Sequence, residues 1–471
     1  GRPSSSGRRR VLHVATQVGE IGGHTRNMWR WIDNDVDSAH SAVLTRQTGP
    51  VPEALLRAVG ASGEAVSRVN KRPGGLLAWA AELQKHLAAA DLVVLHTHNQ
   101  DIVPFLALAG MRRRPQVVIL NHADHVFWVG VNFVDAVVST RRSGHALCAD
   151  RRGVAAERNL TAPLCLEASP RRRDRREAKR LLGLDPDDVM LLTVARAVKF
   201  RPLGALSFAD ALLPVLIEEP RARLVAVGPG GSVDWSAAEA LAPGRVIALP
   251  ETPDTARFYE AADVYVDSFP FVSNTSLLEA GLHGIPLVSR QPFGPGCEIM
   301  GADSIGMDGV LCSARDLGQF QDFLRNFVRS ADLRHKVGEA TRASIEATNV
   351  GAGLRDALSR LYRQIEDLPA QEPPAAPIAD SPRFDPLDLY TPFVYGSPDP
   401  PGRRRTPADR RALALETSLK IMPVKARLGA WLRLARRRAF VFRSPAQAWR
   451  YLVPEWLASR LGEARDGAST R

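Results

Sequence analysis

The sequence predicts an α/β protein in which two doubly wound, Rossmann-like parallel sheets face each other across a cleft, followed by a helical basic extension. Three observations support this class. Short runs of β-branched residues alternate with segments of helical periodicity, which is typical of crossovers in a parallel sheet. The alternation stops once, near residues 162–170, and then resumes. A chain of 471 residues is also too long for one compact core.

The first series of predicted strands lies in the first third of the chain. Each strand is short and apolar throughout, as expected for strands that are covered on both faces of a sheet. Helical patterns such as residues 76–90 lie between them, so the crossovers should be right-handed and the sheet parallel. The predicted strands are residues 11–15, 42–46, 92–96, 117–120 and 136–139.

A second series follows the charged residues 171–180, which we interpret as the solvated face of a helix. Ligands of doubly wound sheets bind beyond the carboxyl ends of the strands, so we expect the site in the cleft between the two sheets. The predicted strands of this series are residues 190–195, 223–227, 245–249, 264–267, 286–289 and 310–312.

We divide the chain into a flexible N-terminus at 1–10, an acceptor-side domain at 11–165, a nucleotide-sugar-binding domain at 166–366, a proline-rich linker at 367–405 and a tail at 406–471. The tail predicts amphipathic helices, because apolar residues recur in it at helical spacing. These residues are Val424, Leu428, Trp431, Leu432 and Ala435, followed by Trp449, Tyr451, Leu452, Trp456 and Leu457.

The net charge of +11 belongs to the tail. Residues 401–471 hold 17 Lys and Arg against 5 Asp and Glu, whereas the other 400 residues hold 45 basic and 46 acidic groups. Two interpretations of the tail stay open: it packs across the domains, or it attaches to an anionic membrane with its arginines at the lipid headgroups. Nucleic acid is not expected as a partner, because no recognised nucleic-acid module accompanies the charge.

The composition also indicates the cellular compartment in which the protein is expected. No run of about eighteen apolar residues predicts a membrane-spanning helix, and the arginines at 8–10 precede no apolar segment of a secretory signal. The four cysteines form no C-x-x-C pair, which argues against a zinc knuckle or a disulfide framework. We expect a cytoplasmic protein, peripheral on the inner face of the cell membrane if the tail binds lipid.

The stretch from Val264 to Ser289 is the most informative one. A strand ends at Asp267, and small polar residues then open a helix, where unpaired backbone amides attract phosphate. Glu279 follows in that helix and is suited to accept hydrogen bonds from a ribose diol. The alternative is an ordinary helix with Ser273 or Asn274 as its N-cap. The small polar residues are Ser273, Asn274, Thr275 and Ser276.

A second loop, at residues 194–202, follows the first strand of the second series. It carries the three cations Arg196, Lys199 and Arg201 at the carboxyl end of that strand, where a diphosphate would lie. Lysine is a compact charge that can follow a leaving group. The alternative is a surface loop with incidental arginines.

The pattern D-x-F-P-x(4)-T-x(3)-E-A-x(3)-G-x-P-x-V, from Asp267 to Val288, resembles the C-terminal half of GT-B glycosyltransferases. It is most similar to the protein O-linked N-acetylglucosaminyltransferase family. The resemblance implies that Lys199 binds the donor diphosphate and Glu279 the ribose. It also implies that the loop with Glu251 and Thr252 lies beside the base.

The first half resembles the retaining GT-B transferases of polysaccharide assembly. Its first strand leads to Gly22 and Gly23, whose backbone can approach a phosphate closely. That family commonly carries two glutamates separated by seven residues; Glu279 corresponds to the second, but Phe271 stands at the first position. Inversion and retention of the anomeric configuration both stay open.

Histidines are the candidate acid–base groups. His122 directly follows a predicted strand at the cleft edge, with Asp124 and His125 close by, and is the candidate base. His24 and His98 are further acceptor-side candidates. Each of these histidines could instead be a structural residue with satisfied hydrogen bonds.

We expect no metal ion and no cofactor. His122 and His125 have a spacing that suits one face of a helix, but the region predicts a loop without a carboxylate pair. The Asp35-Val36-Asp37 triplet, which mimics the metal motif of another transferase fold, falls between predicted elements. Arg196, Lys199 and the helix amides would then balance the leaving diphosphate.

The resemblance therefore implies a metal-independent hexosyl- or N-acetylhexosaminyltransferase that moves a sugar from a nucleotide diphosphate, UDP by expectation, to a glycan or lipid-linked acceptor of surface polysaccharide. Two alternatives stay open: a UDP-sugar 2-epimerase of the same fold and a non-catalytic scaffold that binds glycan or membrane. The absence of a G-x-x-x-x-G-K-[ST] loop argues against a kinase or ATPase.

Overall fold

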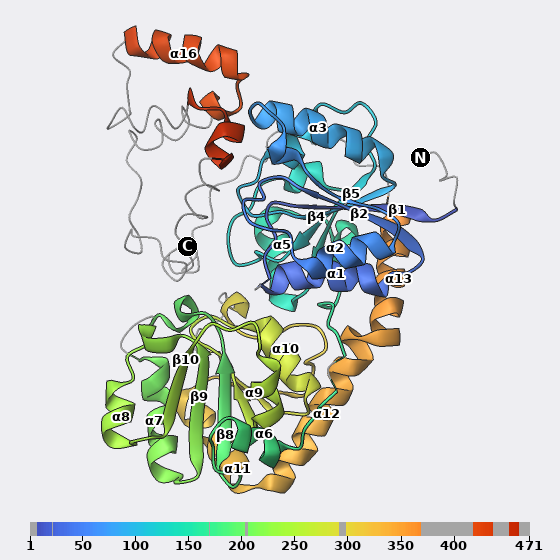
Figure 1. Ribbon diagram of the computed structural model, residues 1–471. Helices are drawn as coiled ribbons and strands as arrows, with labels where there is room; N and C mark the ends of the chain where they lie inside the picture. The colour runs from blue at the N-terminus through green and yellow to red at the C-terminus, as the bar shows by residue number, and fades with distance from the viewer. Residues whose placement is uncertain are drawn as a thin grey trace.

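A computed structural model describes residues 7–20, 22–168, 170–202, 206–291, 298–368, 418–436 and 452–460. It contains two parallel sheets, each covered by helices on both faces (Figure 1). The two doubly wound domains predicted from the sequence are thus confirmed. Their strands point their carboxyl ends at the region between the domains, where the loops that carry the candidate residues lie.

Within the described residues, the first sheet has seven strands in the order β3-β2-β1-β4-β5-β6-β7. All neighbours are parallel, and Ala15 at the end of β1 pairs with His96 at the end of β4. The strands are β1 (Arg9–Ala15), β2 (Ser38–Leu44), β3 (Val66–Arg68), β4 (Leu92–His96), β5 (Gln116–Asn121), β6 (Ala136–Ser139) and β7 (Asn159–Thr161). The helices are α1 (Gly23–Asn34), α2 (Glu53–Ala61), α3 (Leu76–Ala89), α4 (Val103–Ala109) and α5 (Arg142–Arg152).

The second sheet has six strands among the described residues, in the order β10-β9-β8-β11-β12-β13. The strands are β8 (Val189–Val194), β9 (Ala222–Gly228), β10 (Val246–Pro250), β11 (Val264–Val266), β12 (Leu287–Arg290) and β13 (Leu311–Ala314). The helices are α6 (Arg175–Leu181), α7 (Phe208–Glu218), α8 (Ser236–Leu241), α9 (Ala256–Ala261), α10 (Asn274–Leu282), α11 (Leu317–Arg329) and α12 (Ala331–Asn349). Helix α6 lies in the charged segment that we interpreted as a solvated helix.

The chain returns to the first domain after α12. Helix α13 (Gly351–Glu366) lies beside α1 under the first sheet (Figure 1). Leu354, Leu358 and Leu361 are buried in one cluster with first-sheet residues, and Trp31 Nε1 donates a hydrogen bond to Tyr362 Oη at 2.8 Å. We expected residues 166–366 to form one domain, but the apolar face of α13 is buried against the other one.

The described parts of the tail pack on the first domain near the start of α3. Helix α16 (Val424–Arg436) holds Arg427, whose guanidinium is fully buried and contacts Glu455 at 2.8 Å. The backbone amide of Trp456 donates to the carbonyl of Gly74 at 3.2 Å. Packing of the tail on the body is therefore observed for these segments. The linker beyond residue 368, together with Trp449 and Tyr451, lies outside the described residues.

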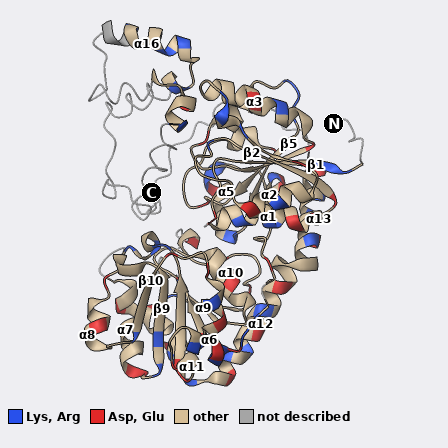
Figure 2. Cartoon of the chain, in the orientation of Figure 1, with Lys and Arg blue, Asp and Glu red and all other residues tan. Residues whose placement is uncertain are grey.

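Two properties of the tail bear on the membrane interpretation. Figure 2 shows Lys and Arg on α16, and Leu428 and Leu432 on the same helix are 53% and 44% exposed. In the part of the chain with described coordinates, no helix combines the length and apolar character that crossing a bilayer requires.

Candidate active site

The start of α10 is organised by a buried carboxylate. Asp267, at the end of β11, accepts a hydrogen bond from the Ser273 backbone amide at 2.9 Å and one from Ser289 Oγ at 3.0 Å. Ser273 Oγ donates to the Val194 carbonyl at 3.1 Å and makes no side-chain cap on the helix. The first turn of α10 is therefore not an ordinary capped terminus, and Asn274 Oδ1 is buried there without a partner among the described residues.

Lys199 lies directly against this loop. Its Nζ donates to the Val272 carbonyl at 2.9 Å and lies 5.5 Å from the centre of the Phe271 ring. Burial lowers the pKa of Lys199 to about 8, although the Asp267 carboxylate acts to raise it. Burial likewise raises the pKa of Asp267 to about 7. A partly buried cation thus lies beside the amides where an anion would bind, balanced by one carboxylate.

The first domain brings a second helix start to the same place. A Cβ on Gly23, the first residue of α1, would lie 2.2 Å from Thr275 Oγ1 of α10, so only glycine fits this approach. Gly22, just before it, has φ 144°, a conformation that favours glycine. The amino ends of α1 and α10 therefore meet between the domains, with Gly22 and Gly23 at one end and Ser273–Ser276 at the other. Lys199 contacts Val272, just before α10, and the donor-binding role of these residues stays a prediction.

Glu279 of α10 is engaged by two arginines of the first domain. Arg26 Nη1 and Arg30 Nη2 lie 2.8 and 3.0 Å from Glu279 Oε1. The Glu279 side chain is only 11% exposed, so a ribose could reach it only by displacing or sharing these contacts. Neither arginine was predicted as a site residue, although their spacing of four residues places them on one face of α1.

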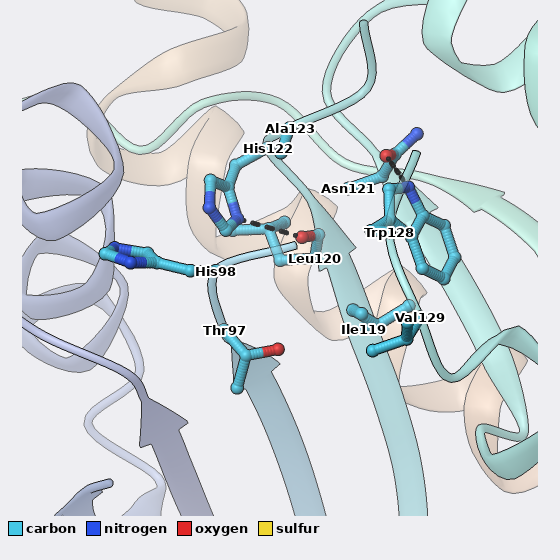
Figure 3. A pocket seen from close by; sticks show the side chains of 9 residues that line it. All are labelled: Thr97, His98, Ile119, Leu120, Asn121, His122, Ala123, Trp128 and Val129. Carbon is cyan, nitrogen blue, oxygen red and sulfur yellow. Dashed lines mark hydrogen bonds between the residues drawn. The ribbon is translucent and has the colours of Figure 1, made fainter. Parts of the chain in front are cut away.

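Three candidate histidines form one cluster on the first domain. The rings of His24 and His122 stack with centroids 5.1 Å apart, and His98 meets His24 edge-on at 5.8 Å. Figure 3 shows His98 and His122 lining a pocket from the ends of neighbouring strands, together with Thr97, Asn121 and Trp128. Two of the three histidines therefore line this pocket, just beyond the carboxyl ends of β4 and β5.

Burial keeps these imidazoles neutral. It lowers the pKa of His24 to about 4 and the pKa of His122 well below its ordinary value. The charge of Arg196 adds to the lowering at His24, so the cationic loop of the second domain faces the cluster. His122 Nδ1 lies 3.2 Å from the Leu120 carbonyl (Figure 3). A carbonyl can only accept, so Nδ1 donates and Nε2 keeps the lone pair of a base.

Asp124 and His125 have a different environment from the one we expected. Asp124 is 4% exposed, with His125 Nδ1 at 3.2 Å and Arg141 Nε at 3.5 Å. Arg141 also contacts Asp303 of the second domain at 3.0 Å. The His125 ring packs edge-on against Phe271 with centroids 4.7 Å apart. Asp124 thus belongs to a network between the domains, and Phe271 places an apolar ring against His125.

Glu251 and Thr252 are not brought together with the other candidates. They follow the edge strand β10, where Thr252 Oγ1 accepts a hydrogen bond from the Asp254 amide at 3.2 Å. Their place beside a base stays a prediction. Among the residues with described positions, no group of three or more His, Cys, Asp or Glu could hold a metal ion.

Comparisons with known proteins are consistent with this geometry. Residues 188–330 match the family described as "Glycosyl transferases group 1". That segment contains Lys199, Asp267 and Glu279. No curated protein matches the sequence.

Solved structures resemble the chain over most of its length. A glycosyltransferase from Rickettsia africae has a TM-score of 0.56 at 11% identity, over 76% of this chain and 99% of that one. Anabaena Alr3699/HepE, solved with UDP, has a TM-score of 0.56 at 14% identity, over 75% and 99%. A mutant O-GlcNAc transferase of Thermobaculum terrenum has a TM-score of 0.50 at 17% identity, over 78% and 69%. At such low identities these likenesses establish the fold alone.

Proposed function

We propose that this chain, a group 1 glycosyltransferase with the GT-B fold, transfers a sugar from UDP to a hydroxyl of a glycan or lipid-linked acceptor. One observation carries the proposal: the amino ends of α1 and α10 meet beside Lys199, where a diphosphate would be held by two helix starts and a cation. Helix starts attract anions because their amides are unpaired and the helix dipole is positive there. UDP in the Anabaena structure supports the choice of nucleotide.

The second domain would stabilise the leaving group. As the bond between the sugar and the diphosphate breaks, negative charge grows on the β-phosphate, and Lys199 with the α10 amides would balance it without a metal ion. Bound diphosphate would also raise the pKa of Lys199 and keep this side chain protonated. Glu279 would accept hydrogen bonds from the ribose hydroxyls after its ion pairs with Arg26 and Arg30 have broken.

The first domain would hold the acceptor. Its hydroxyl would enter the pocket lined by His98 and His122, and His122 Nε2 would take the hydroxyl proton. Neutral histidines suit a base, because an imidazolium could not accept a proton. Closing the two domains on the donor would exclude water and limit hydrolysis of the sugar.

A thermal melt with UDP tests donor binding. We expect UDP to raise the melting temperature, and Lys199→Met to abolish the increase while it keeps the apolar stem of the side chain. The matched control is Lys336→Ala, which removes an exposed lysine of the same domain. An equal UDP shift in Lys199→Met and Lys336→Ala would rule out the proposed donor site.

Turnover separates the enzymatic alternatives. Screening UDP- and GDP-sugars for release of nucleotide identifies the donor, and dependence on a lipid-linked or glycan acceptor identifies a transferase. A 2-epimerase would instead convert the UDP-sugar to its epimer without an acceptor. A scaffold would bind UDP without either reaction; Phe271, in place of a carboxylate, is the observation that favours it.

For the tail we propose attachment to an anionic membrane while it remains packed on the body. Leu428 and Leu432 would enter the interface, with the exposed Lys425 and Arg433 at the headgroups. We expect the full chain to float with liposomes that contain anionic lipid, and Leu428→Glu/Leu432→Glu to remain in the lower fraction. Equal flotation on neutral liposomes, or none on anionic ones, would contradict the electrostatic form of this attachment.

A further inference from the structure

A continuous line of hydrogen-bonded polar side chains crosses the first sheet beneath α1 and α13. His96 Nε2 of β4 lies 2.9 Å from His13 Nδ1 of β1, and His13 Nε2 lies 3.0 Å from His40 Nδ1 of β2. His40 Nε2 then contacts Asp35 at the end of α1, with the carboxylate at 3.2 Å and the backbone carbonyl at 3.1 Å. All three histidines are buried, with exposure of 1% or less.

Asp35 fixes the tautomer of every ring in this line. Its carbonyl and carboxylate oxygens only accept, so His40 Nε2 donates, and in the neutral ring Nδ1 is the acceptor. His13 must then donate from Nε2 and accept at Nδ1, and His96 must donate from Nε2. His96 Nδ1 is therefore left with a lone pair, and it has no hydrogen-bond partner among the described residues.

The unpartnered nitrogen belongs to the residue next to the acceptor pocket. Thr97, which follows His96, lines that pocket (Figure 3). The charge of His24 acts on the pKa of His96, and the charge of His96 acts on the pKa of His122. The line therefore ends at the carboxyl end of β4, next to a residue of the pocket that His98 and His122 line.

The other elements that pack on the line bring few charges to it. Trp31 of α1 packs edge-on against the His13 and His96 rings. Tyr362 of α13 donates from Oη to Asp35 Oδ2 at 2.5 Å, and the Arg9 guanidinium lies over the Tyr362 ring. Burial lowers the pKa of His96 to about 3 and the pKa of His13 well below its ordinary value. Burial thus keeps His96 and His13 neutral, and the line ends in one carboxylate.

We propose that His96, His13 and His40 relay a proton between the acceptor pocket and Asp35 during sugar transfer. The proposal rests on the proposed function, which releases one proton from the acceptor hydroxyl. In the forward step, His96 Nδ1 gains this proton from the His24–His122 cluster through a bridging water. The Nε2 protons of His96, His13 and His40 then pass to His13 Nδ1, His40 Nδ1 and the Asp35 carboxylate.

The shift leaves each imidazole neutral, with its proton on Nδ1, and neutralises Asp35. No imidazolium accumulates, so the burial that disfavours charge does not block the relay. Burial raises the pKa of Asp35, but hydrogen bonds from His40 and Tyr362 lower it more, so the net pKa lies below the ordinary value. Asp35 therefore holds the proton briefly. The reverse shift returns it to the pocket, where the departing nucleotide diphosphate takes it up.

The variant Asp35→Asn tests whether residue 35 must accept a proton, because it keeps the hydrogen bond from His40. The Asn oxygen can still accept the hydrogen bond of His40 Nε2, but an amide cannot take the proton. We expect kcat to fall tenfold or more, with an unchanged KM for donor and acceptor and an unchanged UDP shift in the thermal melt. The control is Val11→Ala, a buried position on the same face of β1, which should lower the melting temperature and leave kcat unchanged.

A tautomer measurement keeps the relay testable even if Asp35→Asn misfolds. In the wild-type chain with 15N-labelled histidine, we expect His13, His40 and His96 all as Nε2–H tautomers at neutral pH, with His96→Gln assigning the last one. Retained kcat in Asp35→Asn, or a proton on Nδ1 of His96 at rest, would overturn the relay. Failure of the proposed function would show differently, as absence of wild-type turnover.

Discussion

The two sides of the cleft differ in their chemistry. The second domain presents fixed charge, with the partly buried Lys199 and the buried Asp267 beside the start of α10. The first domain presents imidazoles that burial keeps neutral, and its arginines pair with carboxylates of the second domain: Arg26 and Arg30 with Glu279, and Arg141 with Asp303. A fixed cation suits a group that leaves as an anion, whereas a neutral base suits a group that must lose a proton. The difference indicates which side holds the donor and which the acceptor.

The largest expected effect is on the charged side. Lys199→Met should lower kcat/KM by about 10²- to 10³-fold, the usual cost of removing one group that stabilises charge in the transition state. Steady-state kinetics with the UDP-sugar and acceptor measure it. A loss below about threefold, within the scatter expected of a surface lysine such as Lys336, would place the diphosphate elsewhere.

The next effect is on the approach of the two domains. Gly23→Ala introduces a Cβ that would lie 2.2 Å from Thr275 Oγ1, so α1 and α10 should be forced apart. We expect UDP affinity, measured by calorimetry, to fall about tenfold, which corresponds to roughly 1.4 kcal/mol.

The matched control for Gly23→Ala is the double variant Gly23→Ala/Thr275→Ala. It removes the atom that clashes and should recover part of the lost affinity. Unchanged UDP affinity in Gly23→Ala alone would mean that the meeting of the two helix starts plays no part in donor binding.

The affinity of the charged side for UDP should also depend on pH. UDP binds the protonated form of Lys199, whose pKa is about 8 in the empty protein. Affinity should therefore be constant below about pH 8 and fall by up to about tenfold per pH unit above it. In Lys199→Met this decline should vanish and leave a weaker affinity that no longer changes above pH 8. The same slope in both proteins would assign the titration to another group.

The smallest effect concerns the arginines that cross the cleft. In the empty protein Arg26 and Arg30 form ion pairs with the Glu279 carboxylate, so a ribose can bind Glu279 only if these ion pairs break. We expect Arg30→Ala to tighten UDP binding by about two- to fivefold, because a partly buried ion pair no longer opposes it. Weaker binding instead would mean that Arg30 contacts the nucleotide, and the first domain would then share the charged role.

The sequence predicts the fold well for a physical reason. Strands that are buried on both faces are continuous apolar runs, and β1, β4, β5 and β6 begin and end within two residues of the expected positions. The strands that were not expected, β3 and β7, are three residues long at the two edges of the sheet. The continuous apolar run that predicts a strand is interrupted in them by the polar residues Ser67, Arg68, Asn159 and Thr161.

The two sides of the site differ in how far their residues can be recognised from local sequence. Lys199, Glu279 and the small polar residues of α10 lie in contiguous motifs that can be read directly. Arg30 and Glu279 meet although they are 249 residues apart in the chain. The line from His96 to Asp35 joins three strands and a helix end, and no local spacing reveals that their rings touch. Local motifs therefore select residues around the start of α10, whereas contacts between distant segments emerge only from the fold.

The most direct test of the central claim is a 31P NMR titration of UDP with the full-length chain at pH 7, repeated with Lys199→Met. Our account predicts that both phosphorus resonances shift on binding to the wild-type chain, and that the shift disappears in the variant while Lys336→Ala retains it. Phosphorus resonances that move equally in the wild-type chain and in Lys199→Met would contradict a diphosphate site between α1, α10 and this lysine.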